Sequence, residues 1–166
     1  FFGKGQFVPA RFEKREGEYR FSQEITGRYL QPLSDAKLLP VTTQTWPMVV
    51  ERREKTEICR LNYEASIRET DKGFELRITA RGTDNVPLAV EINFREGGQF
   101  TGVVPAPNVG DAFLLKDGFA EYRAGNDMIR LGPGKYGHAY TQVRGGEPKL
   151  PGQSVYLTGF TPFEHT

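Results

Sequence analysis

The sequence contains one cysteine, two histidines and no marked surplus of either charge. The single cysteine, Cys59, excludes an internal disulfide and any zinc cluster built from cysteines. His138 and His165 cannot form a histidine-rich metal site unless carboxylates from elsewhere complete it. The 22 Lys and Arg residues are offset by 21 Asp and Glu residues. No basic face is therefore predicted, and nucleic acid is not an expected partner.

Long apolar runs and familiar catalytic motifs are missing as well. No stretch approaches the roughly 18 consecutive apolar residues of a membrane span, so we expect no span. The chain has no G-x-S-x-G, P-loop, H-E-x-x-H or EF-hand pattern. The preferred interpretation therefore assigns no catalytic residue and no cofactor. Calcium remains an alternative, because side-chain oxygens occur near turns at Asp84-Asn85, Asp111, Asp117 and Asn126-Asp127, although Asp and Asn are also ordinary turn residues.

What the chain does contain is typical of one domain built from strands. Its 166 residues, 37% hydrophobic and 12% aromatic, are enough to bury a sizeable core. The 19 glycines and 11 prolines interrupt every pattern long enough for a substantial helix. Short strand candidates recur at a spacing of roughly ten residues. We therefore expect an all-β fold, an antiparallel β-sandwich with meander hairpins and little or no helix, with a barrel as the less favoured alternative.

The clearest signal is an alternation of apolar and polar residues between residues 58 and 95. The stretches ICRLNYEASIR, FELRITAR and VPLAVEINFR each place apolar side chains at every second position. A period of two is typical of a strand with one buried and one solvated face. Short turns at 69–73 and 82–85 then predict a three-stranded antiparallel meander. The predicted inward residues are Cys59, as a buried structural thiol, and Leu61, Tyr63, Ala65, Ile67, Phe74, Leu76, Ile78, Ala80, Val86, Leu88, Val90, Ile92 and Phe94.

The rest of the chain predicts further strands and a division into three regions. QFVPARFEK and EYRFSQEI form an expected hairpin about Arg15-Glu16-Gly17, within an N-terminal unit of residues 1–31. The proline-punctuated residues 32–57 are expected to be an irregular crossover, and residues 58–166 the main sheets. Because the chain begins at Phe1 and not at methionine, we expect a processed product or a fragment of a larger protein. Further strands are expected in QFTGVV, AFLLKD, FAEYRA, DMIRLG, HAYTQVRG and SVYLTGF.

Residues 131–145, LGPGKYGHAYTQVRG, form the main candidate site. Tyr136, His138 and Tyr140 alternate along one expected strand, so their side chains would share a face. Tyr and His suit proton transfer, and aromatic rings stack on sugars. The neighbouring glycines would let a ligand or a second domain approach the backbone closely. The structural alternative is that the same alternation buries two tyrosines with His138 hydrogen-bonded between them.

Three further residues complete the predicted ligand-binding set. Trp46 precedes a proline in the irregular region, where its ring would either stack on a sugar or fill space in the core. Arg130 and Arg144 would neutralise the carboxylate of an acidic sugar. Glu164 and His165 are adjacent, and an acid/base role for them is disfavoured because neighbouring residues of a strand face opposite ways.

Three stretches together resemble sandwich domains attached to carbohydrate-active enzymes: RGTDNVPLAVEINFREGGQF, YRAGNDMIRLGPG and SVYLTGFTPFEHT. The resemblance is particularly to the C-terminal β-sandwich of heparinase II/III-like polysaccharide lyases, and it covers residues 58–166. In such lyases a helical toroid supplies much of the catalytic machinery, and the sandwich packs against it. The resemblance implies a sugar-related context and fits a secreted or periplasmic location. The chain shows no toroid, so lyase activity is not carried over to it.

Three functions remain open at this point. The preferred hypothesis is a non-catalytic β-sandwich module associated with polysaccharide binding or degradation, which contacts a glycan or a partner catalytic domain. The second is a carbohydrate-active enzyme of the lyase type, in which Tyr136, His138 or Tyr140 takes the proton. The third is a purely structural or assembly domain without a small-molecule ligand.

Overall fold

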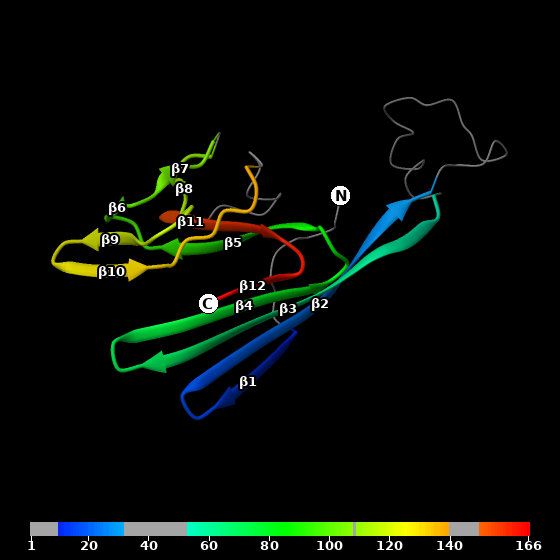
Figure 1. The fold of residues 1–166 in the computed structure, drawn as a ribbon, viewed down its shortest axis with the longest axis horizontal. Coiled ribbons are helices and arrows are strands. Elements are labelled where there is room, and N and C mark those ends of the chain that lie inside the picture. The colour runs from blue at the N-terminus through cyan, green and yellow to red at the C-terminus, as the bar shows by residue number, and fades with distance from the viewer. Residues whose placement is uncertain (1–9, 32–52, 108, 140–149) are drawn as a thin grey trace.

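The predicted all-β fold is confirmed. The computed structural model describes residues 10–31, 53–107, 109–139 and 150–166, and within these ranges every regular element is a strand (Figure 1). The same ranges contain no helix that is long and apolar enough to cross a membrane. The strands are, in chain order, β1 (Arg11–Arg15), β2 (Glu18–Leu30), β3 (Lys55–Thr70), β4 (Gly73–Gly82), β5 (Pro87–Phe94), β6 (Gln99–Thr101), β7 (Val104–Pro105), β8 (Ala112–Leu114), β9 (Ala120–Ala124), β10 (Asp127–Leu131), β11 (Gln153–Phe160) and β12 (Phe163–His165).

The strands form three sheets in two layers. One layer is a five-stranded sheet of order β1-β2-β3-β4-β12, which we call the large sheet. A four-stranded sheet of order β5-β11-β8-β7 and a three-stranded sheet of order β10-β9-β6 pack against each other and together make up the other layer (Figure 1). Neighbouring strands are antiparallel, except that β11 runs parallel to β8. A small core lies between the four-stranded and three-stranded sheets, where the buried residues are Leu115, Ala120, Val155 and Leu157.

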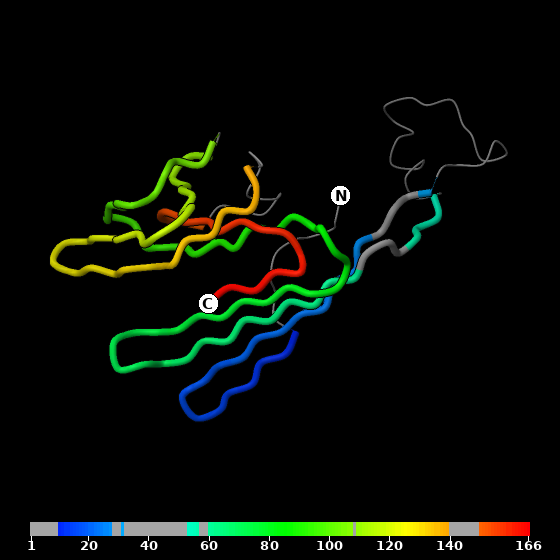
Figure 2. The backbone as a smooth tube through the Cα atoms, in the orientation of Figure 1, coloured from blue at the N-terminus to red at the C-terminus, as the bar shows by residue number. Residues whose placement is uncertain are grey.

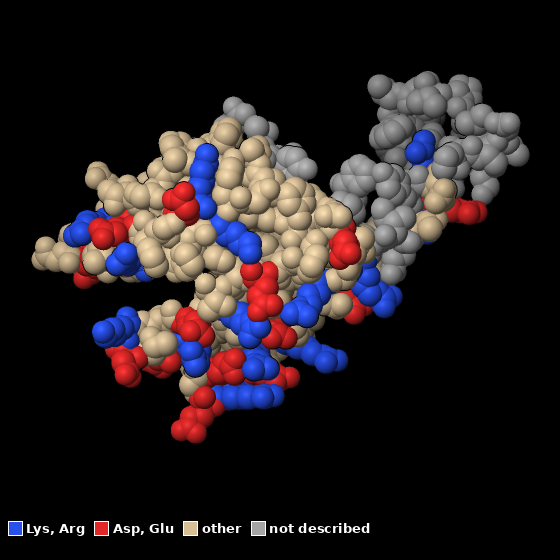
Figure 3. All heavy atoms as spheres, in the orientation of Figure 1, with Lys and Arg blue, Asp and Glu red and all other residues tan. Residues whose placement is uncertain are grey.

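The large sheet has one apolar face and one charged face, as the alternation predicts. Registers across β2, β3 and β4 place Tyr19 opposite Ile67 and Ile67 opposite Leu76 on the apolar face. The charged face consists of arginines and glutamates in near-equal numbers, and Figure 3 shows these charges concentrated on this layer. They are Arg11, Arg15, Arg20, Arg60, Arg68, Arg77 and Arg81 with Glu13, Glu18, Glu24, Glu64, Glu75 and Glu164.

The predicted meander is wrong at its third strand. The strand over residues 87–94, β5, does not pair with β4 but with β11 in the other layer. Figure 2 shows the chain passing between the layers at two places, after β4 and between β11 and β12. The two crossings are bonded together through Thr161: its N–H donates to the carbonyl of Val86 (3.0 Å), and its own carbonyl accepts from the N–H of Asn85 (2.8 Å).

The side chain of Thr161 completes this corner between the layers. Its hydroxyl donates to the carbonyl oxygen of Thr83 (2.6 Å) and accepts from the N–H of Val86 (2.9 Å). The link between β4 and β5 therefore joins a strand of the large sheet to a strand of the four-stranded sheet. The link between β11 and β12 joins the same two sheets in the opposite direction. The pairings β4–β12 and β5–β11 follow from this arrangement, which the period-two pattern cannot specify because it records only which side of a strand is apolar.

Other expectations are corrected or fall outside the described residues. Phe74, predicted to be inward, is 73% exposed. The irregular region ends earlier than expected, since β3 begins at Lys55, and the expected hairpin β1–β2 lies in the same sheet as β3 and β4. The side chain of Cys59 and most of the expected strand HAYTQVRG are outside the part of the chain that the structure describes.

Candidate binding surface

Residues 132–139, the described part of the segment that follows β10, do not form the strand expected to carry Tyr136 and His138. Residues 132–139 form no ladder, and only Tyr136 makes an isolated bridge, with Thr158. The backbone nonetheless lies along β11: the N–H of Gly137 donates to the carbonyl of Thr158 (2.8 Å), and the N–H of Thr158 donates to the carbonyl of Lys135 (3.0 Å). The expected common face of Tyr136 and His138 is therefore not formed as a strand face. Tyr140 lies outside the described residues.

The glycines of this segment allow close approach to the protein's own backbone. A Cβ atom on Gly134 would lie 2.6 Å from the backbone nitrogen of Asp117, and one on Gly137 would lie 2.8 Å from the Cα of Gly159. A Cβ on Gly132 would lie 2.6 Å from the carbonyl oxygen of Gly118. Contacts this short do not occur in folded proteins, so each position requires glycine for packing. These three glycines thus need no ligand to explain them.

His138 is tied to two strands of the four-stranded sheet. Its Nε2 lies 2.9 Å from the carbonyl oxygen of Leu88, and its ring meets Phe160 edge-on at 5.3 Å. A carbonyl oxygen only accepts, so Nε2 must carry the proton and donate. The main-chain carbonyl of His138 also accepts from the hydroxyl of Thr158 (3.0 Å), which is fully buried. Nε2 is therefore engaged in fixing the chain, and this favours the structural interpretation of His138.

Two other predicted ligand residues, Tyr136 and Arg130, lie within the described part of the chain and contact different partners. Tyr136 is 37% exposed, and the ammonium of Lys116 lies over its ring at 4.6 Å. Arg130 lies on β10 with its guanidinium 4.3 Å from the ring centre of Phe119. Trp46 and Arg144 are outside the described residues. Each of the two described residues thus has an aromatic–cation contact of its own.

Metal-binding side chains are not clustered in the part of the chain that the structure describes. No three His, Cys, Asp or Glu side chains there come close enough together to hold an ion. Two of the residues considered for calcium, Asn85 and Asp111, have left-handed backbone conformations with φ of 58° and 55°. Asn and Asp tolerate this conformation better than other residues with a Cβ, so their turn role accounts for them.

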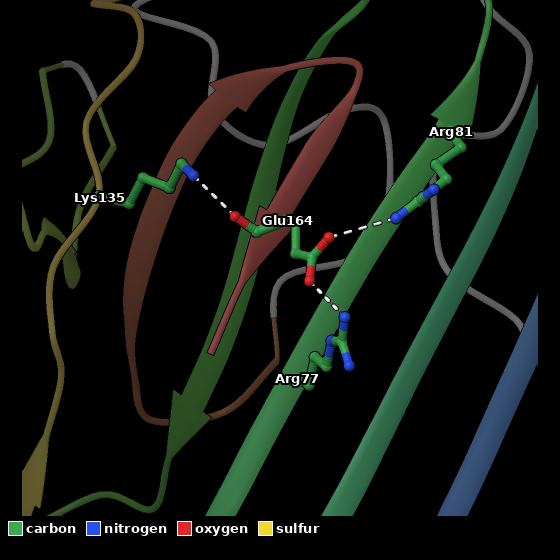
Figure 4. A network of polar contacts seen from close by, with 4 residues as sticks. All are labelled: Arg77, Arg81, Lys135 and Glu164. Carbon is green, nitrogen blue, oxygen red and sulfur yellow. Dashed lines mark hydrogen bonds and ion pairs between the residues drawn. The ribbon is translucent and has the colours of Figure 1, made fainter.

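Glu164 and His165 lie on opposite faces of β12, as strand geometry requires. The Glu164 carboxylate accepts from Arg77 and from Arg81 (3.2 Å), while the ammonium of Lys135 donates to the Glu164 carbonyl (2.8 Å; Figure 4). The hydrogen bond and charge of Arg77, followed by the charge of Arg81, lower the pKa of Glu164. On the other face, Nε2 of His165 lies 2.9 Å from the carbonyl oxygen of Pro133. The two side chains therefore hold β12 in place and do not form an acid/base pair.

The candidate binding surface lies elsewhere, on the apolar face of the large sheet near its hairpin turns. We define the distal apolar face by side chains that share one side of β1, β2, β3 and β4 near their hairpin turns: Phe12, Tyr19, Phe21, Ile67, Phe74 and Leu76. Phe12 is 58% exposed and Phe74 is 73% exposed, and the other four are half-buried. Figure 3 shows an open notch between this end of the sheet and the hairpin of β9 and β10. The second layer thus leaves this part of the face incompletely covered.

Three of the four aromatic side chains of the distal apolar face, Phe12, Tyr19 and Phe21, lie together. The ring of Phe12 lies 5.1 Å from that of Phe21 and is stacked on Tyr19 at 6.4 Å. Lys14 places its ammonium 5.6 Å from the centre of the Tyr19 ring. The sequence analysis predicted that Ile67, Phe74 and Leu76 face inward and made no such assignment for Phe12, Tyr19 and Phe21. The available signal was Phe74, because it follows the turn glycine Gly73 directly and so lies at the extreme end of the sheet.

Comparisons with protein-family models, with curated proteins and with solved structures gave no match to this chain.

Proposed function

We propose that this chain is a non-catalytic β-sandwich module that binds a partner protein domain through the distal apolar face. The observation that carries the proposal is the exposure of Phe12 and Phe74 on a contiguous aromatic and aliphatic surface. Contiguous exposed apolar surface on a folded protein commonly marks an interaction site. Aromatic side chains are also enriched in the centres of protein interfaces.

The chemistry of this face favours a protein surface over a glycan. A sugar presents hydroxyl groups that need hydrogen-bond partners, and binding sites for small polar ligands supply them at defined positions. The distal apolar face offers the Tyr19 hydroxyl and otherwise phenyl and aliphatic groups. At its margin one cation, Lys14, and one anion, Glu69, lie on the same side of the sheet. A complementary partner presents an apolar patch bordered by a carboxylate facing Lys14 and a cation facing Glu69.

The class of partner we propose is the catalytic domain of a polysaccharide-degrading enzyme. The support is the resemblance of residues 58–166 to sandwich domains that pack against such catalytic domains. Chemistry within the module itself has less support, because Nε2 of His138 is occupied by the Leu88 carbonyl. The proposal thus retains the non-catalytic accessory role and assigns its contact to the sheet face in place of the Tyr136 segment.

The proposal is tested by cross-linking from the face in cells that make the protein. A photoreactive benzoylphenylalanine in place of Phe74 should form cross-links to the apolar surface of a polysaccharide-acting domain. The matched control carries the same group at Glu75, which is the neighbouring residue on the opposite face. Mass spectrometry of the cross-linked peptides identifies the partner and the surface involved.

Two results would overturn the proposal. One is equal cross-linking from positions 74 and 75, or cross-links only to proteins that do not act on polysaccharides. The other is direct binding of the chain to a glycan array that is abolished by Tyr136→Ala and unaffected by Phe74→Ser. That second result would move the contact to the segment around Tyr136 and make the ligand a sugar.

A further inference from the structure

β1 is an edge strand whose outer side pairs with no described residue. It pairs only with β2, and each of its residues, Arg11 to Arg15, is exposed. An edge strand presents a row of unpaired N–H and C=O groups to which another strand can be added. Its side chains determine which strand fits, because residues directly opposite each other in an antiparallel pair share a face and contact each other.

The charged face of the large sheet has a sign pattern that can be read across its strands. In one row, Arg15 of β1 lies opposite Glu18, which lies opposite Arg68, which lies opposite Glu75, so the sign alternates at each step. The last pair is bonded at 2.8 Å. In the next row, Glu13 lies opposite Arg20. A strand added beyond β1 continues the pattern if it places an acidic residue against Arg11 and a basic residue against Glu13.

We propose that the added strand is β1 of a second copy of this chain. In an antiparallel arrangement with Phe12 opposite the partner's Phe12, Arg11 lies opposite the partner's Glu13, and Glu13 opposite the partner's Arg11. Two-fold symmetry produces both ion pairs from one sequence. Lys14 then lies opposite the partner's Ala10, so the arrangement contains no pair of like charges.

Neighbouring registers that keep the two faces of the sheet do not offer this match. In the first such register each residue lies opposite a partner residue two positions further along the chain, which places Glu13 opposite Glu13 and Arg11 opposite Arg15. The next step in the same direction pairs Glu13 with the partner's Arg15, but it places Lys14 opposite Lys14 and Phe12 opposite Glu16. One step the other way places Arg11 opposite Arg11. Like charges directly opposite each other destabilise a strand pair. Of these registers, only the one with Phe12 opposite Phe12 forms two Arg–Glu pairs without placing like charges opposite each other.

The apolar side of the same pairing places an exposed ring beside its symmetry-related copy and leaves the face of the sheet open. Phe12 is 58% exposed and stands next to Phe21, at 5.1 Å between ring centres. Pairing with the partner's Phe12 continues this aromatic group across the two-fold axis. The two large sheets become one continuous sheet, with both apolar faces on one side and both charged faces on the other. This dimer uses an edge, whereas the proposed function uses a face, so each can fail independently of the other.

The test is sedimentation equilibrium of the full chain over a wide range of concentrations, with charge-reversed variants. Wild type should show a reversible monomer–dimer equilibrium. Arg11→Glu sets two carboxylates against each other at both symmetry-related pairs and should weaken the dimer about tenfold or more, and Glu13→Arg should do the same with two guanidinium groups. An equimolar mixture of the two variants should form a heterodimer, and the double variant R11E/E13R should dimerise like wild type. Thermal unfolding of each variant shows that it is folded.

Arg15→Glu is the matched control, because it reverses a charge on the same face of the same strand. In the proposed register residue 15 lies beyond the last charged pair. Its ion pair with Glu13 of the same strand (3.3 Å) is exposed and contributes little, so this change should leave the dimer within about twofold of wild type. A monomer at every concentration overturns the proposal. So does a dimer that Arg15→Glu alters as strongly as Arg11→Glu does, or a mixture of the two single variants that stays monomeric.

Discussion

The corner at Thr161 offers the sharpest test of how the two layers are joined. Thr161 is 2% exposed, and its hydroxyl bonds to Thr83 and Val86 of the link between β4 and β5. The change Thr161→Val keeps a side chain of similar size and removes only the hydroxyl. The main-chain bonds between Thr161 and Val86 or Asn85 remain available in the variant.

The magnitude follows from what each partner loses. Val86 is buried, so its N–H is left without an acceptor and without water, which costs about 1–3 kcal/mol. Thr83 is exposed, so its carbonyl can bond to water, and only the net value of one hydrogen bond is lost, about 0.5–1.5 kcal/mol. Valine is less polar than threonine, which offsets part of this loss. We expect Thr161→Val to lower the free energy of unfolding by about 1–4 kcal/mol.

Urea unfolding followed by tryptophan and tyrosine fluorescence measures this difference. Thr101→Val, a change at an exposed position on the short strand β6, is the control and should alter stability by less than about 0.5 kcal/mol. A loss at Thr161 no larger than that of the control would refute the reasoning. It would mean that the main-chain bonds alone hold the corner.

Three other changes test the segment after β10 and the arginine contacts of β12. Gly137→Ala forces a Cβ to within 2.8 Å of the Gly159 Cα and should lower the free energy of unfolding by about 1–3 kcal/mol. Gly110→Ala, which has open space around it, should change the free energy of unfolding by less than about 0.5 kcal/mol. Similar values for both variants would contradict the packing argument. His138→Ala should lower stability by about 1–2 kcal/mol in urea unfolding, because the Leu88 carbonyl loses its donor, and His138→Gln should recover part of the loss because its amide can donate; no difference between the two would argue against the hydrogen bond. The pKa of Glu164 is lower in the folded than in the unfolded chain, so the stability that its carboxylate contributes is complete above the ordinary glutamate pKa of about 4.3 and is lost as the pH falls below it. The Tm of Glu164→Gln should therefore be below that of wild type at pH 7 and converge with it in acid. A constant difference in Tm would contradict the stabilising role of the Glu164 ion pairs.

Local features of the chain determined the faces of the strands. The alternation in RLNYEASIR and FELRITAR correctly separates the charged from the apolar face of β3 and β4, and glycine-containing turns correctly separate β1 from β2 and β9 from β10. These features can be read locally because each side chain faces either water or a neighbouring layer, and polarity at alternate positions records which one. The all-β class follows from the same signal repeated along the chain.

The tertiary structure decided which strands meet and which surfaces stay open. Main-chain hydrogen bonds between strands are alike for almost any sequence, so nothing in VPLAVEINF shows that β5 pairs with β11 and not with β4. The same holds for His138, whose acceptor belongs to Leu88, 50 residues away in the chain. Apolar character showed that Phe74 belongs to the inner face, but only the reach of the second layer left it exposed. Burial depends on what lies opposite, and this is a property of the assembled layers, which a single strand cannot encode.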